Sequence, residues 1–190
     1  MVASFSAQKN LTPNRKITSA FIWPSETFVR ESIDGYMAGG SLFLTSKNLV
    51  ETEFKENLFH YKSSSIRPHI PPHIKSYFRR SNSEKSKIPW ICLTSANVSK
   101  AAWGQLQKSA TQLLIHHFEI GVLFINEDKQ FTIAETPAIG DDFVQFPLPY
   151  DFLNPPKYNL TDAQNPPWVS DAPHMKPDKY GICLSNQNVL

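Results

Sequence analysis

The alternation of hydrophobic and polar positions along the chain predicts a mixed α/β domain. Two long apolar runs stand out, at residues 88–97 (IPWICLTSAN) and 111–125 (TQLLIHHFEIGVLFI). Both predict buried strands, and the first is apolar almost throughout, which is typical of an interior strand covered on both faces. A shorter buried strand is predicted within residues 19–25, where Pro24 ends it.

Residues 73–78 (HIKSYF) predict a further strand, because β-branched and aromatic side chains alternate with polar ones. Successive side chains of a strand point to opposite faces, so His73, Lys75 and Tyr77 would share one face. Two prolines directly precede this segment, and they exclude a helix that would continue into it.

Three segments have a helical pattern, at residues 25–35, 45–59 and 99–107. Ser25 and Ser99 stand at the start of the first and the third, where a serine hydroxyl can cap the free backbone N–H groups of a helix. Short helices beside these strands are the expected α component of the fold.

The chain divides into a short leading segment and one domain. Residues 1–18 are polar and turn-prone, and we expect a flexible N-terminal segment there. Residues 19–190 predict a single domain. From about residue 136 proline and aromatic residues dominate, so we expect an ordered, irregular tail wrapped over the domain.

Composition supports a folded globular protein but does not by itself indicate its partner. Of the 190 residues 41% are hydrophobic and 12% aromatic, enough for a sizeable core. A net charge of +2 says little about a local nucleic-acid-binding patch. Cys92 and Cys183 lie far apart, the start lacks the apolar stretch of a signal peptide, and no run is long enough to span a membrane. We expect a soluble protein of the cytosol or nucleus.

Metal and serine-hydrolase chemistry find little support in the sequence. His69 and His73 have the four-residue spacing of a helical zinc site, but the prolines between them forbid that helix. His116 and His117 are adjacent and would face opposite sides of a strand. Ser95 lacks a GxSxG motif, and no P-loop pattern occurs. We therefore expect no metal and no cofactor.

Polar side chains at two predicted strand ends suggest a phosphate site. Lys75 supplies a fixed charge, Asn97 an amide donor at a strand-to-helix turn, and His73 a group that can exchange a proton near neutral pH. Glu119, within an apolar segment, needs a partner such as an imidazole unless it marks a strand edge facing water. Surface and capping roles explain the same residues, so the residues alone leave both interpretations open.

Longer segments of the sequence resemble a known protein family. Residues 86–104 (SKIPWICLTSANVSKAAWG), with 73–80 (HIKSYFRR) before and 118–124 (FEIGVLF) after, resemble the C-terminal half of the tyrosyl-DNA phosphodiesterase family, within the phospholipase D superfamily. GYMAGGSL, FPLPYD and PPWVSDAPHMKPD are similar to other family segments, so the resemblance runs from about residue 18 to the late 170s. It implies a phospholipase D-like mixed sheet flanked by helices, one half of a pseudo-symmetric two-domain fold.

The resemblance also implies roles for the candidate residues. His73 and Lys75 match the second HxK motif, in which the histidine protonates the tyrosyl oxygen as a DNA 3′-phosphate is cut from topoisomerase I. The same histidine then activates the water that releases a phosphohistidine intermediate. Lys75 and Asn97 would bind the non-bridging oxygens, and Glu119 matches an acid that positions a catalytic histidine.

The implied partners are DNA 3′ ends, single- or double-stranded, that carry the topoisomerase I tyrosine or a peptide. Ser99, Gly40 and Ser41 match positions that touch the DNA strand. DNA repair would place the protein in the nucleus, or also in the cytoplasm.

One departure leaves three alternatives. In the family the nucleophilic histidine comes from an HxK motif in the N-terminal half, whereas the resemblance here is to the C-terminal half, in which His73 and Lys75 match the second HxK motif. The chain is either half of such an enzyme, inactive without its missing half, or a homodimeric nuclease that uses two copies of His73. The third alternative is a non-catalytic binder of single-stranded DNA ends through Lys75, Arg79 and Arg80. The first is favoured, and it predicts an exposed apolar face where the missing half would pack.

Overall fold

The computed structural model describes residues 19–50, 52–63, 67–80, 87–125, 130–134, 138–140 and 143–185. The expected flexible segment 1–18 lies outside the described residues. No helix in the described part of the chain has the length and apolar character needed to cross a membrane.

A three-stranded antiparallel sheet is the element that matters for the candidate site. It consists of β3 (Lys75–Arg79), β4 (Trp90–Thr94) and β7 (Gly121–Ile125), in the order β3-β4-β7. The prediction of an interior strand at residues 88–97 is confirmed in its central position, since β4 is hydrogen-bonded on both sides. The strand predicted from residue 73 begins only at Lys75.

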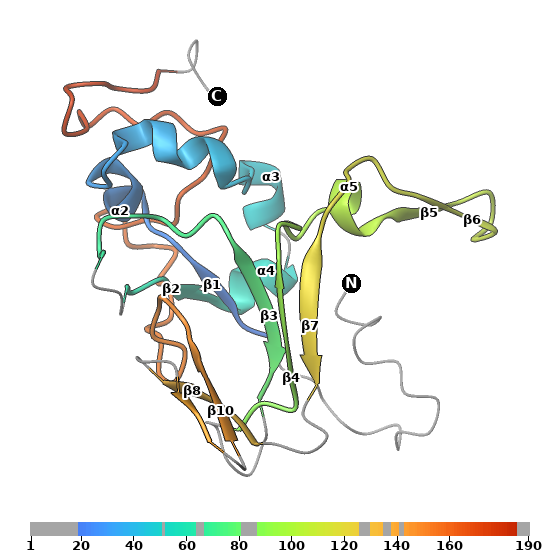
Figure 1. Ribbon diagram of the computed structural model, residues 1–190. Helices are drawn as coiled ribbons and strands as arrows, with labels where there is room; N and C mark the ends of the chain where they lie inside the picture. Colours follow the sequence, from blue (N-terminus) through green and yellow to red (C-terminus); the bar gives the residue numbers. More distant parts are fainter. Residues whose placement is uncertain are drawn as a thin grey trace.

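Three smaller β units surround this sheet (Figure 1). The strand predicted near Pro24 is confirmed as β1 (Phe21–Trp23), which pairs in parallel with β2 (Leu58–His60). A second unit has the order β8-β10-β9, formed by β8 (Gln130–Ala134), β9 (Ala138–Ile139) and β10 (Phe143–Pro147). The hairpin of β5 (Gln105–Gln107) and β6 (Gln112–Leu114) projects away from the rest of the fold, at the right of Figure 1.

The helices are short. They are α2 (Glu26–Arg30), the 3₁₀ helix η1 (Gly35–Ser41), α3 (Ser46–Leu49), α4 (Thr52–Glu56) and α5 (Lys100–Trp103). Both predicted N-caps are confirmed: the Ser25 hydroxyl accepts from the Phe28 N–H at 3.1 Å, and the Ser99 hydroxyl from the Ala102 N–H at 3.2 Å.

The single helix predicted over residues 45–59 is wrong. The segment forms α3 and α4, and its end belongs to β2. Leu58 is fully buried where it pairs with Phe21 of β1, so burial against a distant strand outweighs the local helical pattern.

The long buried strand predicted over residues 111–125 is also wrong. The run forms β6 and β7, separated by residues 115–120. The backbone N–H groups of His116 and His117 both donate to the Ala101 carbonyl at 3.0 Å, which turns the chain onto α5. β7 then lies at the edge of its sheet, with Val122, Leu123 and Ile125 about half exposed.

Two hydrophobic clusters hold the fold together. The first joins the β3-β4-β7 sheet to β8 and β10 around Ile88, Ile91 and Phe146, and the Phe124 ring meets Phe146 edge-on at 4.9 Å. The second surrounds the buried Trp168 of the C-terminal tail, whose indole N–H donates to the Leu42 carbonyl at 3.1 Å.

Trp168 lies directly against η1. A Cβ atom added to Gly39 would be 2.0 Å from its ring, so glycine is required there for close packing. The irregular tail expected from about residue 136 is wrong in its first part, which forms β9 and β10. Only residues 148–185 are without a further named helix or strand.

Candidate active site

The candidate site forms where three strand ends meet. Lys75 begins β3 and pairs with Thr94 at the end of β4, and Thr94 pairs with Gly121 at the start of β7. Sheet register therefore brings the start of the HxK strand, the turn after β4 and the segment before β7 to one edge. These are the segments that carry Lys75, Asn97 and Glu119.

Lys75 has the electrostatics of a partly desolvated cation. Partial burial lowers the pKa of its ammonium group, and the negative charge of Glu119 acts in the opposite direction. Lys75 and Glu119 are thus close enough for their charges to interact. Lys75 and Tyr77 are two residues apart on β3 and therefore lie on the same face of the sheet, as predicted.

His73 lies two residues before β3 and is exposed. Among the described residues, its imidazole has no hydrogen bond or ion pair. It is close to Lys75 in the chain.

Among the described residues, Glu119 makes one hydrogen bond and one ion pair through its side chain, and neither is with His73. One carboxylate oxygen, Oε2, accepts a hydrogen bond from Ser95 Oγ at 2.5 Å. The other, Oε1, lies 3.6 Å from His117 Nδ1. The side chain is only 19% exposed, so it does not face open water. An imidazole is therefore a partner of Glu119, as expected, but it belongs to His117.

The turn after β4 is tied to the segment before β7 through backbone and hydroxyl groups. The Ser95 N–H donates to the Ile120 carbonyl at 3.0 Å, and Ser95 Oγ accepts from the Ile120 N–H at 3.1 Å. Thr94 Oγ1 donates to the same carbonyl at 2.9 Å. These bonds fix the Ser95 hydroxyl and the carboxylate it contacts. Apart from its place at a predicted strand end, Ser95 had no feature in the sequence that indicated this role.

Asn97 and Ser99 follow on the way into α5. The Asn97 carbonyl accepts from the Ser99 N–H at 2.8 Å, and its half-exposed side-chain amide has no partner among the described residues. The Ser99 hydroxyl accepts from the helix but can still donate. α5 has four residues, too few for a substantial helix dipole, so anion binding here would depend on side chains.

Tyr77 stabilises the turn that carries Asn97. Its hydroxyl donates to the Ala96 carbonyl at 2.8 Å, and its ring meets Trp103 edge-on at 5.2 Å. Burial raises the pKa of the phenol to about 12, so Tyr77 stays protonated at neutral pH. It joins β3 to the Asn97 turn.

Gly40 and Ser41 are placed on η1, which packs against the tail. Ser41 Oγ donates to the Ala38 carbonyl at 3.4 Å. Within the described part of the chain, no hydrogen bond or ion pair joins either residue to Lys75, Asn97 or Glu119. Their contact with DNA stays a prediction.

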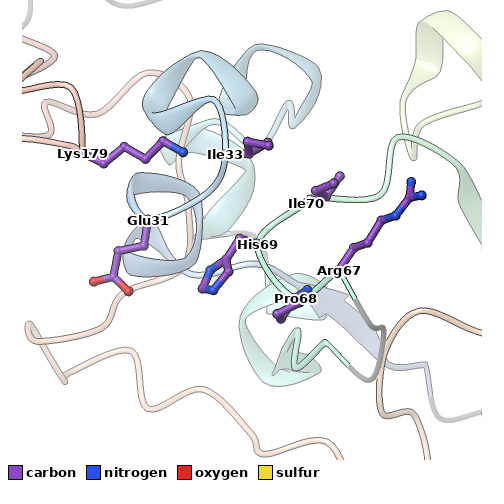
Figure 2. A pocket seen from close by; sticks show the side chains of 7 residues that line it. All are labelled: Glu31, Ile33, Arg67, Pro68, His69, Ile70 and Lys179. Atoms are coloured by element: carbon purple, nitrogen blue, oxygen red, sulfur yellow. The ribbon is translucent and has the colours of Figure 1, made fainter.

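A shallow cavity of about 390 Å³ lies elsewhere, between the turn after α2 and the segment ahead of His73 (Figure 2). Its lining consists of Glu31, Ile33, Arg67, Pro68, His69, Ile70 and Lys179. None of the candidate catalytic residues contributes to it. In the described ranges, no three His, Cys, Asp or Glu side chains are grouped to hold a metal ion.

Comparison with known proteins gives a consistent result. The family model described as tyrosyl-DNA phosphodiesterase matches residues 1–159. Tyrosyl-DNA phosphodiesterase 1 of Arabidopsis thaliana is 33% identical over 204 residues, covering 90% of this chain and 33% of that protein. The protein of the same name from Drosophila melanogaster is 39% identical over 158 residues, covering 77% of this chain and 27% of that protein. The chain spans about a third of the length of these relatives.

Solved structures support the fold. A yeast tyrosyl-DNA phosphodiesterase mutant matches with a TM-score of 0.59 at 20% identity, over 88% of this chain and 41% of that one. A second mutant of the yeast enzyme gives a TM-score of 0.58 at 23% identity, over 82% and 37%. The mixed α/β fold of the chain therefore corresponds to part of those structures.

Proposed function

Because the chain belongs to the tyrosyl-DNA phosphodiesterase family, we propose that it supplies one half of a phosphodiesterase site. The substrate is a DNA 3′ end blocked by a phosphotyrosyl or related group, and the setting is DNA repair in the nucleus. The observation that carries the proposal is the position of Lys75. It begins β3 at the sheet edge shared with the Asn97 turn and the Glu119 carboxylate.

The proposed chemistry needs two imidazoles. A nucleophilic imidazole on a companion half attacks phosphorus, and the bond from phosphorus to the tyrosyl oxygen breaks. His73 donates a proton to that oxygen as it leaves. It then accepts a proton from the water that attacks phosphorus and displaces the nucleophilic imidazole, so that the P–N bond of the phosphohistidine breaks. Lys75 and Asn97 bind the non-bridging oxygens, where negative charge develops in the transition state.

Three segments of the chain have the HxK spacing, beginning at His60, His73 and His174, but only His73 and Lys75 match the family's catalytic motif. The chain is therefore proposed to be inactive by itself. The exposed face of β7 supports docking of a companion half, on the same polypeptide or a separate one. Phe118 and Ile120 are highly exposed beside Glu119, and Val122, Leu123 and Ile125 continue this apolar strip along an edge strand.

A cleavage assay tests the proposal. The chain is incubated at micromolar concentration with a 3′-phosphotyrosyl oligonucleotide, alone and with the N-terminal half of a complete family member. We expect no cleavage alone, and cleavage with the companion that is lost in His73→Ala. Robust His73-dependent cleavage by the chain alone would favour the homodimer instead, with two His73 imidazoles at one phosphorus.

A non-catalytic binder of single-stranded DNA ends is the remaining alternative. It predicts salt-sensitive binding that survives His73→Ala, with no cleavage under either condition. One observation weighs against DNA binding by Lys75, Arg79 and Arg80. Arg80 Nη1 donates to the Phe152 carbonyl at 2.7 Å, so part of this guanidinium's hydrogen-bonding capacity already serves to hold the fold together.

A further inference from the structure

His117 occupies a position that the proposed chemistry does not use. Its backbone N–H is bound to the Ala101 carbonyl of α5, and its Nδ1 lies 3.6 Å from Glu119 Oε1. The imidazole is 60% exposed and is therefore accessible to solvent. Ser95 holds the other oxygen of the same carboxylate.

The charge of Glu119 affects what Lys75 can offer to a phosphate. The carboxylate interacts electrostatically with the Lys75 ammonium. The pairing of Thr94 with both Lys75 and Gly121 places the segment that carries Glu119 at the same sheet edge as Lys75. The Ser95 hydroxyl is neutral and leaves the charge uncompensated. The His117 imidazole can compensate it, because an imidazole gains a positive charge between pH 8 and 5.

We propose that His117 is a positioning residue of the phosphate site: its imidazolium offsets the charge of Glu119 and leaves the field of Lys75 available to a DNA phosphate. This role rests on the proposed function. Binding of a phosphodiester end therefore strengthens as pH falls, and His117 is the group responsible. The other charged or titratable groups on the elements around the pair are Lys75, Tyr77 and Arg79 on β3, Cys92 on β4, Lys100 on α5, and the neighbouring His116.

The chain provides a matched control in His116. Its backbone N–H binds the same Ala101 carbonyl at the same 3.0 Å, and its side chain is exposed. Among the described residues it has no ion pair. His116→Asn thus changes an adjacent imidazole without removing a contact to Glu119.

The test measures binding by fluorescence anisotropy with a labelled oligonucleotide that ends in 3′-phosphotyrosine. This probe is a phosphodiester, so its own charge is constant over the pH range used. All variants carry His73→Ala, which prevents turnover and removes the imidazole of His73 from the site. The parent should bind about threefold to fivefold more tightly at pH 5.5 than at pH 7.5, as expected for an exposed charge pair.

His117→Asn should abolish this pH dependence, and His116→Asn should retain it. Glu119→Gln should bind at pH 7.5 about as tightly as the parent at pH 5.5, and adding His117→Asn to it should change nothing further. Thermal melting by circular dichroism checks that each variant is folded.

Two results would overturn the inference, and they differ. If His117→Asn and His116→Asn keep the same pH dependence while Lys75→Ala still weakens binding, only the role of His117 is lost. If Lys75→Ala binds like the parent at both pH values, the proposed phosphate site fails, and the role of His117 fails with it.

Discussion

Ser95 and Glu119 form the tightest side-chain contact at the candidate site. Ser95 Oγ donates to Glu119 Oε2 at 2.5 Å and accepts from the Ile120 N–H at 3.1 Å. One hydroxyl thus joins the end of β4 to the segment that leads into β7 and fixes a largely buried carboxylate between them.

Ser95→Ala should lower the free energy of unfolding by about 1–2 kcal/mol, because it removes both bonds and leaves a largely buried carboxylate oxygen with a lost donor. Urea unfolding measures this. Ser41→Ala is the control, since the Ser41 hydroxyl makes one long bond at 3.4 Å, and it should change stability by less than about 0.5 kcal/mol. Equal effects of the two substitutions would contradict the bridging role of Ser95.

Lys75→Ala should impair phosphate binding without unfolding the protein. With a companion half present, we expect kcat to fall roughly 10²-fold or more, by analogy with the loss of an oxyanion donor. For oligonucleotide binding, the slope of log K against log salt should decrease by about one. Lys62→Ala, which changes an exposed lysine outside β3, β4 and β7, should leave both unchanged. A near-parental rate for Lys75→Ala would contradict the phosphate role.

The sequence predicted the elements that depend on local interactions, and the strand whose side chains are mostly apolar. The central strand β4 is apolar because it is hydrogen-bonded on both sides and packs Ile91 into the core. Ser25 and Ser99 were recognisable as N-caps because capping depends on residues only three positions away. The family string around Asn97 indicated both fold and family.

The contacts made by Glu119 were not predictable in the same way. Its partner Ser95 is 24 residues away, and they meet only because β4 and β7 pair in one register. A single strand over residues 111–125 would place His117 and Glu119 on the same face but would also bury both. The separate hydrogen bonds to Ala101 expose His117 instead, and nothing in the local pattern signals them.

Acid should destabilise the tail through Glu26. His174 Nδ1 lies 3.7 Å from Glu26 Oε1, and this interaction lowers the pKa of the Glu26 carboxyl despite partial burial. A carboxyl with a lowered pKa in the folded state contributes stability above its unfolded pKa, and this is lost as pH falls through the folded pKa. Stability measured by urea unfolding should therefore drop between neutral pH and pH 3 to 4.

Glu26→Gln should reduce this drop, and Glu31→Gln, which changes an exposed carboxylate in the same region, should not. The Glu26 variant should also be less stable than the parent at neutral pH. A full acid-induced loss of stability in Glu26→Gln would show that other carboxylates are responsible.

Ala110→Gly should stabilise the β5–β6 hairpin. Lys108, Ser109 and Ala110 all have positive φ, at 47°, 55° and 66°, and this left-handed region costs roughly 1–2 kcal/mol for a residue with a Cβ atom. Glycine adopts it without that cost, although its unfolded state gains entropy, so we expect a net gain of about 0.5–1 kcal/mol. The control is Ala102→Gly in α5, which should lower stability by up to about 1 kcal/mol. Urea unfolding and the hydrogen-exchange protection of the hairpin amides measure both changes, and a destabilised hairpin in Ala110→Gly would mean that the turn does not hold this conformation in solution.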